Sequence, residues 1–505
     1  MTNESFILAL DQGTTSSRAI LFDRDLQVRA AEQQEFPQRY PQPGWVEHDP
    51  EVLWQSQRTA MLQVLKRAGC EPGRIAALAV ANQRETVVVW NRRTGRPIHD
   101  AIVWQCRRTA DRCESLRQRG LGNRIREKTG LVLDAYFSAT KIQWILDHVD
   151  GARNSARRGD LLCGTIDSWL VWKLSGGQAH VTDFTNASRT MLFDIHSLRW
   201  DDELLDLFGI PPSMLPAVVS SSGVAAACRL PEFGPHPPSV AGLAGDQQAA
   251  LFGQGCFEPG QTKNTYGTGC FLLMNVGADP VVSRQGLLTT LTAQTRPGAP
   301  SYALEGSVFM GGAVMQWLRD ELKIIARASD AGPIAASIPD AGGVVLVPAF
   351  SGLGAPHWDM YARGALLGLT RGTGRAQIVR AAEESIAYQC FDVVKAMQAD
   401  SRHPISRLRV DGGAAADDFL MQFQADLLAC PLDRPACMET TALGAAALAA
   451  LALGWQTTGS LAARPAEKTF APAMSGETRK TRLASWRKAV ARAARWEEPA
   501  PPQGE

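Results

Sequence analysis

The segment at residues 11–18 combines side chains and backbone groups that could hold a phosphate. It reads Asp11-Gln-Gly-Thr-Thr-Ser-Ser-Arg18 and lies between two apolar runs, a pattern typical of two strands joined by a tight turn. Gly13 allows the backbone to approach a ligand closely, and the amides and hydroxyls that follow can donate to phosphate oxygens. Asp11 could hold a divalent cation, directly or through water. Alone, the segment is equally compatible with an ordinary polar turn.

A second segment whose residues could take part in catalysis runs from Gly245 to Gly253. It places a carboxylate, Asp246, at the start of an alanine-rich helix. In that position Asp246 is predicted to be the helix N-cap. The same position could present the carboxylate to a ligand, because a hydroxyl that attacks phosphorus needs a group to accept its proton. The residues alone leave both interpretations open.

Three further segments of the first half carry polar or aromatic residues that could line a site. The adjacent charges in Asn82-Gln-Arg-Glu-Thr86 favour an exposed ion pair, although they could also bind substrate hydroxyls. Trp104 is either a core anchor or the apolar wall of a site. Lys141 suits a helix that packs on a sheet, while Tyr136, just before it, is free to point at a site.

The second half of the chain echoes the first. Thr265-Tyr-Gly-Thr-Gly-Cys270 resembles the turn at residues 11–16, which indicates two related domains that face one ligand. Leu408–Ala414 is a strand that runs into two glycines, where a flat base could lie against backbone. A helix at Thr441–Ala450 could mirror the one at Gly245–Gly253, and two small-residue helices that cross closely would form a hinge.

Strand and helix patterns alternate along the chain, which indicates an α/β fold. The predicted domains are 1–253 and 254–505, with a disordered tail at 497–505 and a basic surface helix at Thr481–Arg495. The expected strands are Phe6–Leu10, Arg18–Phe22, Ile75–Ala81, Val87–Trp90, Val344–Val347 and Leu408–Val410, and the expected helices include Gly374–Met397 and Asp418–Leu428.

Bulk properties exclude several function classes. The 505 residues carry a formal net charge of +1, so no basic field points to nucleic acid. No apolar run is long enough to insert into a membrane, and the ten cysteines form no Cys-x-x-Cys pair, which favours a cytoplasmic location. The dipeptide Gly-Lys is absent, so a nucleotide could not be bound by a Walker A loop.

Over about residues 5–497 the sequence resembles the FGGY carbohydrate kinases, and among them the branch that acts on glycerol. The matching strings are Ala9–Arg18, Pro43–Pro50, Ile102–Ala110, Asp183–Phe193, Gly245–Gln254 and Lys263–Phe271. The resemblance implies two actin-like (ribonuclease H-like) ATPase domains facing an interdomain cleft. It also implies ATP-dependent phosphorylation of glycerol to sn-glycerol 3-phosphate with Mg²⁺, and a homo-oligomer, either a dimer or a tetramer.

The resemblance assigns roles to residues of both domains. Asp246 would be the general base and, with Asp11, would hold the metal. The residues implied to grip glycerol are Arg84, Glu85, Trp104, Tyr136, Asp246, Gln247 and Phe271. Those implied to hold the nucleotide are Thr14, Thr15, Ser16 and Arg18 in the first domain and Thr268, Gly312, Gln316, Gly413 and Asp417 in the second.

One departure from the family pattern concerns the nucleotide. Asp417-Asp418 stands where the family typically has two asparagines, and a carboxylate offers no amide donor to the adenine. Two alternatives to a glycerol-specific enzyme stay open: a kinase for another polyol or a ketose, and a non-catalytic actin-like ATPase.

Overall fold

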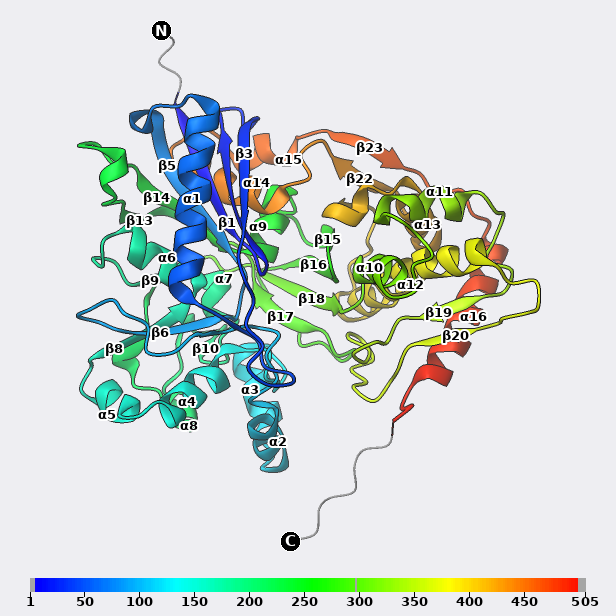
Figure 1. Cartoon of the computed structure of the whole chain (residues 1–505), viewed down its shortest axis with the longest axis horizontal. Coiled ribbons are helices and arrows are strands. Elements are labelled where there is room, and N and C mark those ends of the chain that lie inside the picture. Colours follow the sequence, from blue (N-terminus) through cyan, green and yellow to red (C-terminus); the bar gives the residue numbers. More distant parts are fainter. Residues whose placement is uncertain (1–4, 296–297, 498–505) are drawn as a thin grey trace.

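Two mixed β-sheets, one in each half of the chain, form the frame of the molecule (Figure 1). The computed structural model describes residues 5–295 and 298–497. This two-domain α/β architecture confirms the predicted fold class. No helix within the described residues is long and apolar enough to cross a membrane.

The N-terminal sheet has the order β13-β14-β5-β1-β2-β3. Its strands are β1 (Phe6–Gln12), β2 (Ser16–Phe22), β3 (Val28–Glu35), β5 (Ile75–Asn82), β13 (Ser222–Ala227) and β14 (Ser239–Gly245). A four-stranded sheet and two strand pairs complete the half: β4 (Glu47–His48), β6 (Val87–Asn91), β7 (Ala101–Ile102) and β8 (Leu161–Thr165), then β9 (Val181–Asp183) with β12 (Ala217–Val219), and β10 (Phe193–Asp194) with β11 (Arg199–Trp200).

The helices of this half pack around these sheets. They are α1 (Pro50–Ala68), α2 (Ala110–Gln118), α3 (Gly122–Thr129), α4 (Ser138–His148), α5 (Ala152–Arg157), α6 (Ile166–Leu174), α7 (Phe184–Ala187), α8 (Asp202–Phe208) and α9 (Asp246–Gly253). Helix α1 illustrates how the sequence sets its bounds. The carboxylate of Asp49 caps it by accepting from the N–H of Glu51 at 2.9 Å, and Gly69 ends it in the left-handed conformation.

The C-terminal sheet has the order β17-β18-β16-β15-β21-β22-β23. Its strands, and the separate pair β19–β20, are β15 (Thr262–Tyr266), β16 (Cys270–Gly277), β17 (Leu288–Leu291), β18 (Tyr302–Val308), β19 (Val345–Val347), β20 (Ala365–Leu367), β21 (Leu408–Asp411), β22 (Leu432–Pro435) and β23 (Ala466–Phe470). Its helices are α10 (Ala313–Asp320), α11 (Ala331–Ala336), α12 (Arg375–Ser401), the 3₁₀ turn η5 (Gly413–Ala416), α13 (Asp418–Leu428), α14 (Thr440–Ala452), α15 (Thr458–Ala462) and α16 (Gly476–Ala493).

The same local arrangement occurs at the centre of both sheets. Strand β1 pairs antiparallel with β2 and parallel with β5, while β15 pairs antiparallel with β16 and parallel with β21. The two hairpin turns are the two segments that resemble each other in sequence. The internal echo therefore corresponds to a repeated hairpin.

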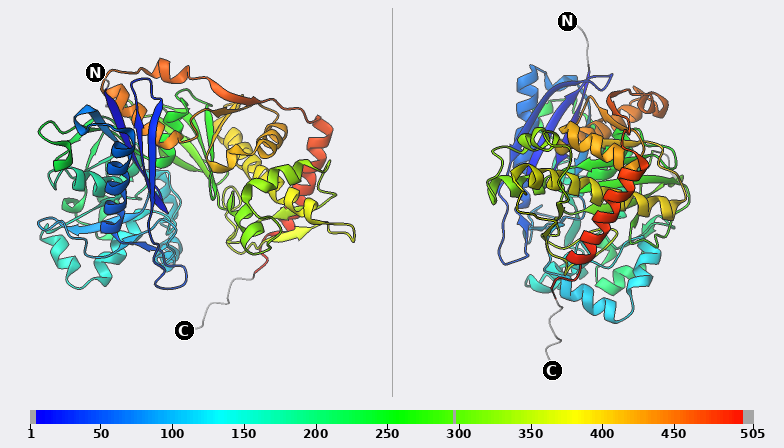
Figure 2. Two further views of the ribbon diagram at one scale, coloured as in Figure 1. Left: turned by 45° about the horizontal axis from the view of Figure 1, so that its top comes forward. Right: turned by 90° about the vertical axis from the view of Figure 1, so that its right-hand side faces the viewer.

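Helix α14, drawn in orange, lies beside the blue strands of the N-terminal sheet (Figure 2) and packs against α9. Helix α14 follows β22 of the C-terminal sheet, yet its apolar residues share a core with Ile7 and Ala79 of the N-terminal sheet. Glycines permit the close approach of the two helices, because a Cβ on Gly444 would lie 1.8 Å from the carbonyl oxygen of Ala249. The predicted crossing of two small-residue helices is confirmed.

The C-terminal end departs from one prediction. Glu497 was expected to begin a disordered tail, but its N–H donates to the carbonyl of Tyr361 at 3.0 Å and its carboxylate pairs with Arg363. These contacts anchor the residue, so the prediction is wrong at this position. Residues 498–505, the rest of the predicted tail, lie outside the described residues.

Candidate active site

Strands β5 and β14 are parallel neighbours, and the residues that follow them meet at one edge of the N-terminal sheet. The register pairs Asn82 with Gly245, so Arg84 comes to lie beside Asp246. The Nε atom of Arg84 is 3.1 Å from Oδ1 of Asp246. The Asp246 side chain is 30% exposed, so one carboxylate is both oriented by a buried arginine and open to a ligand.

Two of these findings correct interpretations made from the residues alone. The segment Asn82–Thr86 is buried, with Arg84 and Glu85 only 3% and 1% exposed, so the favoured surface ion pair is wrong. The charge of the buried Arg84 is compensated by the carboxylate of Glu305 on β18, which the local sequence around Arg84 does not reveal. Asp246 is the first residue of α9 and Gly245 is its N-cap, so the predicted N-cap position is wrong, although Oδ1 of Asp246 accepts from the N–H of Gln247 at 2.7 Å.

Glu85 occupies a strained backbone position with φ of 60°. Several groups hold it there. Its carboxylate accepts from Nε of Arg189 at 2.6 Å, and its carbonyl accepts from Oγ of Ser138 and from Nζ of Lys141, both at 3.1 Å. Burial raises the pKa of Glu85, while the charges of Arg189 and Arg84 act against that rise.

Aromatic side chains from both domains surround this edge of the sheet. The ring of Trp104 lies edge-on to Tyr136 at 5.6 Å and to Phe271 of β16 at 6.3 Å, measured between centroids. Nε1 of Trp104 donates to Oγ1 of Thr14 at 2.9 Å. The aromatic wall formed by Trp104, Tyr136 and Phe271 is therefore hydrogen-bonded directly to the predicted phosphate turn.

Gln247 follows Asp246 on α9 and is held from the C-terminal domain. Its Oε1 accepts from Nζ of Lys263 at 2.5 Å, and Lys263 also donates to Thr265 and to the carbonyl of Phe271. Burial lowers the pKa of Lys263 to about 8. The structure thus brings together all seven residues predicted to bind the triol.

The predicted phosphate turn lies between β1 and β2. Gly13 closes it by donating to the carbonyl of Ser16 at 3.0 Å; Ser16 is buried and Thr15 is exposed at the tip. Arg18 pairs with Glu439, at the start of α14, at 2.5 Å. Burial raises the pKa of Asp11 to about 7; Arg18 opposes this, and the carboxylates of Glu439 and Asp246 add to it.

The residues predicted to hold the nucleotide from the second domain form two groups. The carbonyl of Thr268 accepts from the N–H of Gly311 at 2.8 Å, and Gly312 donates to Gly267, so the β15–β16 turn abuts the start of α10. Gln316, exposed, is one turn further along α10. Gly413 is exposed in η5, with open space around the position of a Cβ.

Asp417 is the N-cap of α13, and its Oδ1 accepts from the N–H of Leu420 at 3.1 Å. A Cβ on Gly332 of α11 would lie 2.1 Å from its Oδ2, so Asp417 also lies against α11. Burial raises the pKa of Asp417. Its neighbour Asp418 points elsewhere and pairs with Arg434 and Lys468.

Sequence reasoning assigned no role to three buried charged residues at the site: Arg189, Lys263 and Glu305. Arg189 and Lys263 lie within the family-like strings, but nothing in the strings shows what they contact. Glu305 had a usable signal, because it is the single charged residue in the apolar strand Tyr302–Val308 and is fully buried. A lone buried carboxylate in a strand requires a cationic partner.

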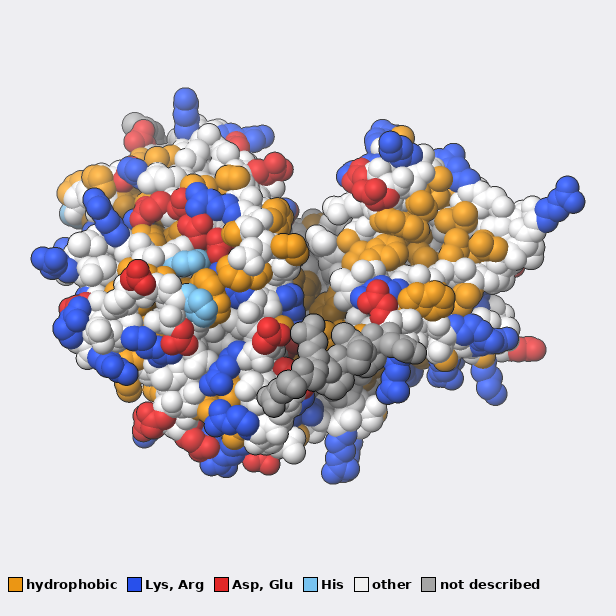
Figure 3. Space-filling model, turned by 60° about the horizontal axis from the view of Figure 1, so that its bottom comes forward, with side chains coloured by type: hydrophobic (Ala, Val, Ile, Leu, Met, Phe, Trp, Pro, Cys, Tyr) orange, Lys and Arg blue, Asp and Glu red, His pale blue; other side chains and the backbone are white. Residues whose placement is uncertain are grey.

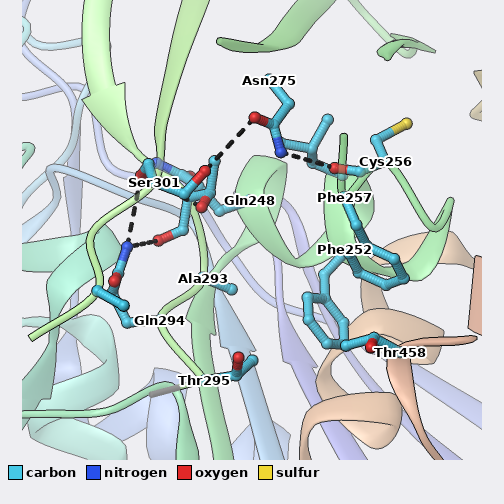
Figure 4. A pocket seen from close by; sticks show the side chains of 13 residues that line it. Gln248, Phe252, Cys256, Phe257, Asn275, Ala293, Gln294, Thr295, Ser301 and Thr458 are labelled. Carbon is cyan, nitrogen blue, oxygen red and sulfur yellow. Dashed lines mark hydrogen bonds between the residues drawn. The ribbon is translucent and has the colours of Figure 1, made fainter. Parts of the chain in front are cut away.

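The molecular surface is hollowed between the two domains (Figure 3). A separate cavity of about 170 Å³ lies beside α9, where Phe252, Phe257, Gln294 and Thr458 line it (Figure 4). None of the predicted site residues lines this cavity, although Gln248 does, and its Oε1 accepts from Arg84 at 3.1 Å. The cavity is therefore distinct from the site at the sheet edge.

The chain matches a known protein family in two parts. The N-terminal domain of the FGGY family of carbohydrate kinases matches residues 6–253, and the C-terminal domain of that family matches residues 262–453. The chain belongs to the FGGY family of carbohydrate kinases.

Individual relatives match along nearly the whole length. The glycerol kinase of Carboxydothermus hydrogenoformans is 56% identical over 98% of this chain and 99% of its own, and that of Symbiobacterium thermophilum is 58% identical with the same coverage. The crystal structure of Plasmodium falciparum glycerol kinase with ADP has a TM-score of 0.89 at 35% identity, covering 97% of this chain and 98% of its own. A xylulose kinase from Lactobacillus acidophilus, at 22% identity and a TM-score of 0.85, shares the fold.

Proposed function

We propose that this chain transfers the γ-phosphoryl group of ATP to a terminal hydroxyl of glycerol and releases sn-glycerol 3-phosphate and ADP. The observation that carries the proposal is the pair Arg84–Asp246, an open carboxylate held at 3.1 Å by a buried guanidinium beside an aromatic wall. The glycerol kinases that are 56% and 58% identical over 98% of the chain support the same conclusion. Residues 1–253 would form the glycerol and phosphate domain, and residues 254–505 the nucleotide domain.

Asp246 would act as the general base. As the hydroxyl oxygen forms its bond to the γ-phosphorus, the carboxylate accepts the hydroxyl proton, and the bond to the β,γ-bridging oxygen breaks to release ADP. Arg84 keeps the carboxylate aimed at the ligand. Phosphoryl transfer depends more on positioning and charge than on covalent chemistry, so this orientation is the main contribution of the pair.

The triol would be held by both polar and aromatic side chains. Arg84, Glu85 and Gln247 offer hydrogen-bonding partners for hydroxyls, while Trp104 and Phe271 cover the carbon edge and exclude water. Because each polar partner is buried, a polyol that lacks one hydroxyl would leave that partner unpaired at a cost of about 1–3 kcal/mol.

The carboxylates of Asp11 and Asp246 are suitable ligands for Mg²⁺. Asp11 and Asp246 are hard oxygen ligands, and they are close enough for the charge of Asp246 to affect the titration of Asp11. The described residues contain no group of three metal-binding side chains, so most ligands would be waters and phosphate oxygens, as Mg²⁺ prefers. When bound, the ion would neutralise charge on the phosphates.

The direct test is mass spectrometry of the products after incubation with ATP, Mg²⁺ and glycerol. Glycerol phosphate is the expected product. Coupled ADP release across a panel of polyols tests specificity, and turnover with erythritol or xylulose equal to that with glycerol would reject it. Polyol-independent hydrolysis of ATP without a phosphorylated product would indicate an actin-like ATPase instead.

The remaining expectations are proposals of the same kind. A cytoplasmic location is proposed from the scattered cysteines, which form no Cys-x-x-Cys pair, and cell fractionation tests it. A dimer or tetramer is implied by the family resemblance, and light scattering of the purified protein measures it.

A further inference from the structure

Four charged side chains are buried together at the predicted triol site. They are Arg84, Glu85, Arg189 and Glu305, whose side chains are between 0% and 2% exposed. Two positive and two negative charges balance. Three of the four belong to the N-terminal half, while Glu305 comes from β18 of the C-terminal sheet.

Both carboxylate oxygens of Glu305 accept hydrogen bonds from Arg84. Its Oε2 accepts from Nη1 of Arg84 at 2.6 Å, and its Oε1 accepts from Nη2 at 2.9 Å and from Nη2 of Arg189 at 3.0 Å. Although burial opposes ionisation, the charges of Arg189 and Arg84 lower the pKa of Glu305 to about 2. A bidentate pair of this type fixes the plane of the guanidinium as well as its distance.

The contacts of Arg84 leave one direction for a ligand. Its Nε faces Asp246, Nη1 donates to both Glu305 and Gln248, and Nη2 donates once to Glu305. Of the five N–H donors of an arginine, three make these hydrogen bonds and Nε–H is engaged in the ion pair with Asp246, so among the described contacts one hydrogen on Nη2 has no partner. Its direction is set by the plane that Glu305 defines.

We propose that Glu305 is a positioning residue for glycerol, which holds Arg84 from the opposite domain in the one orientation that presents a donor to the triol. This inference rests on the proposed function. Its consequence is that the glycerol site, although built mainly from N-terminal residues, is complete only while β18 stays against Arg84. Glycerol binding therefore depends on contact between the two domains.

The test is the variant Glu305→Gln, assayed for the Michaelis constants of both substrates. Loss of the bidentate ion pair between Glu305 and Arg84 is expected to raise KM for glycerol about 10- to 100-fold. KM for ATP should change by less than about threefold. Glycerol should also raise the melting temperature of the variant less than that of the wild type, which reports binding without catalysis.

Glu384→Gln is the matched control. Glu384 is a buried carboxylate of the same domain, held by Nε of Arg380 at 2.8 Å and Nη1 of Arg482 at 3.1 Å, away from the site. This variant should lose a similar amount of stability while KM for glycerol stays at the wild-type value. Glu305→Asp, which keeps the charge but shortens the reach, should raise KM for glycerol by an intermediate factor.

Two results would overturn the inference. One is a folded Glu305→Gln variant whose KM for glycerol equals that of the wild type. The other is an equal rise of KM for glycerol in Glu384→Gln, which would mean that lost stability alone produces the effect. If the wild type itself makes no glycerol phosphate, the proposed function fails instead, so the two failures are distinguishable.

Discussion

Arg84 and Asp246 are 162 positions apart in the chain by their numbers, yet their side chains form an ion pair of 3.1 Å. The pairing arises because each residue follows the carboxyl end of a parallel strand, and the register of β5 and β14 aligns those ends. Ligands of open α/β sheets bind at this edge. The relationship therefore places an oriented carboxylate where a ligand is expected.

Asp246→Asn tests the role of that carboxylate. The amide cannot accept the hydroxyl proton, so kcat should fall about 100- to 10,000-fold. Its similar shape preserves the start of α9, so the melting temperature should stay close to that of the wild type. The measurement is coupled ADP release, and near-normal turnover would exclude Asp246 as the base.

Trp104→Phe tests the link between the aromatic side chains and the predicted phosphate turn. The ring is kept, but the 2.9 Å bond from Nε1 to Thr14 is lost, which should lower kcat/KM for ATP about 2- to 10-fold. Trp200→Phe is the control, since it removes a 3.0 Å indole bond to the carbonyl of Pro216 away from the site. Equal kinetic effects in both variants would contradict the prediction.

Two variants of Asp417 distinguish a role as helix cap from a role in nucleotide binding. Asp417→Ala removes the acceptor for Leu420 and should cost about 1 kcal/mol of unfolding free energy, whereas Asp417→Asn keeps the cap. If the side chain also contacts the base, Asp417→Asn supplies an amide donor and should lower KM for ATP while KM for glycerol stays constant. An unchanged KM for ATP would leave Asp417 with the capping role alone.

Lys141 makes stability depend on pH. Burial lowers its pKa to about 7 in the folded chain, so above pH 7 the unfolded chain binds a proton that the folded chain does not. Stability from this group therefore rises with pH, and the difference in unfolding free energy between the wild type and Lys141→Met should shift by about 2 kcal/mol in favour of the wild type from pH 7 to 9.

Denaturant unfolding at the two pH values measures this shift. Lys480→Met, on the exposed part of α16, removes a positive charge from the surface and serves as the control. A difference between the wild type and Lys141→Met that stays constant, or that shifts in favour of the variant as pH rises, would contradict the prediction.

Gly444→Ala tests the contact between α9 and α14. A Cβ at 1.8 Å from the carbonyl of Ala249 must push the helices apart, at a cost of about 1–3 kcal/mol. Because α9 carries Asp246, kcat should fall as well. Gly122→Ala, where a Cβ meets nothing within 4 Å, is the control, and thermal melting with turnover assays compares the two.

Local patterns were sufficient to predict much of the fold. The strand expected at Ile75–Ala81 is Ile75–Asn82, the helix expected at Gly374–Met397 is Arg375–Ser401, and Asp418–Leu428 agrees at both ends. In each case the apolar periodicity and the flanking glycine or aspartate act within a few residues. The resemblance to the FGGY carbohydrate kinases is likewise confirmed.

The polar interior of the site could not be predicted in the same way. Arg84 next to Glu85 looks like a surface pair because its main partner, Glu305, lies on a strand of the other domain. Lys141 suits a packing helix, and only the fold shows that its Nζ reaches the carbonyls of Glu85 and Tyr136. Buried charges are specified by partners distant in sequence, which a single sequence does not reveal.

Helix α9 has only eight residues, from Asp246 to Gly253. At a rise of about 1.5 Å per residue it is roughly 12 Å long, too short to bend appreciably. One end supplies the carboxylate, and the other rests on α14 through glycines. We therefore expect a shift of α14 to displace α9 as a rigid unit, and with it the carboxylate of Asp246, the proposed proton acceptor.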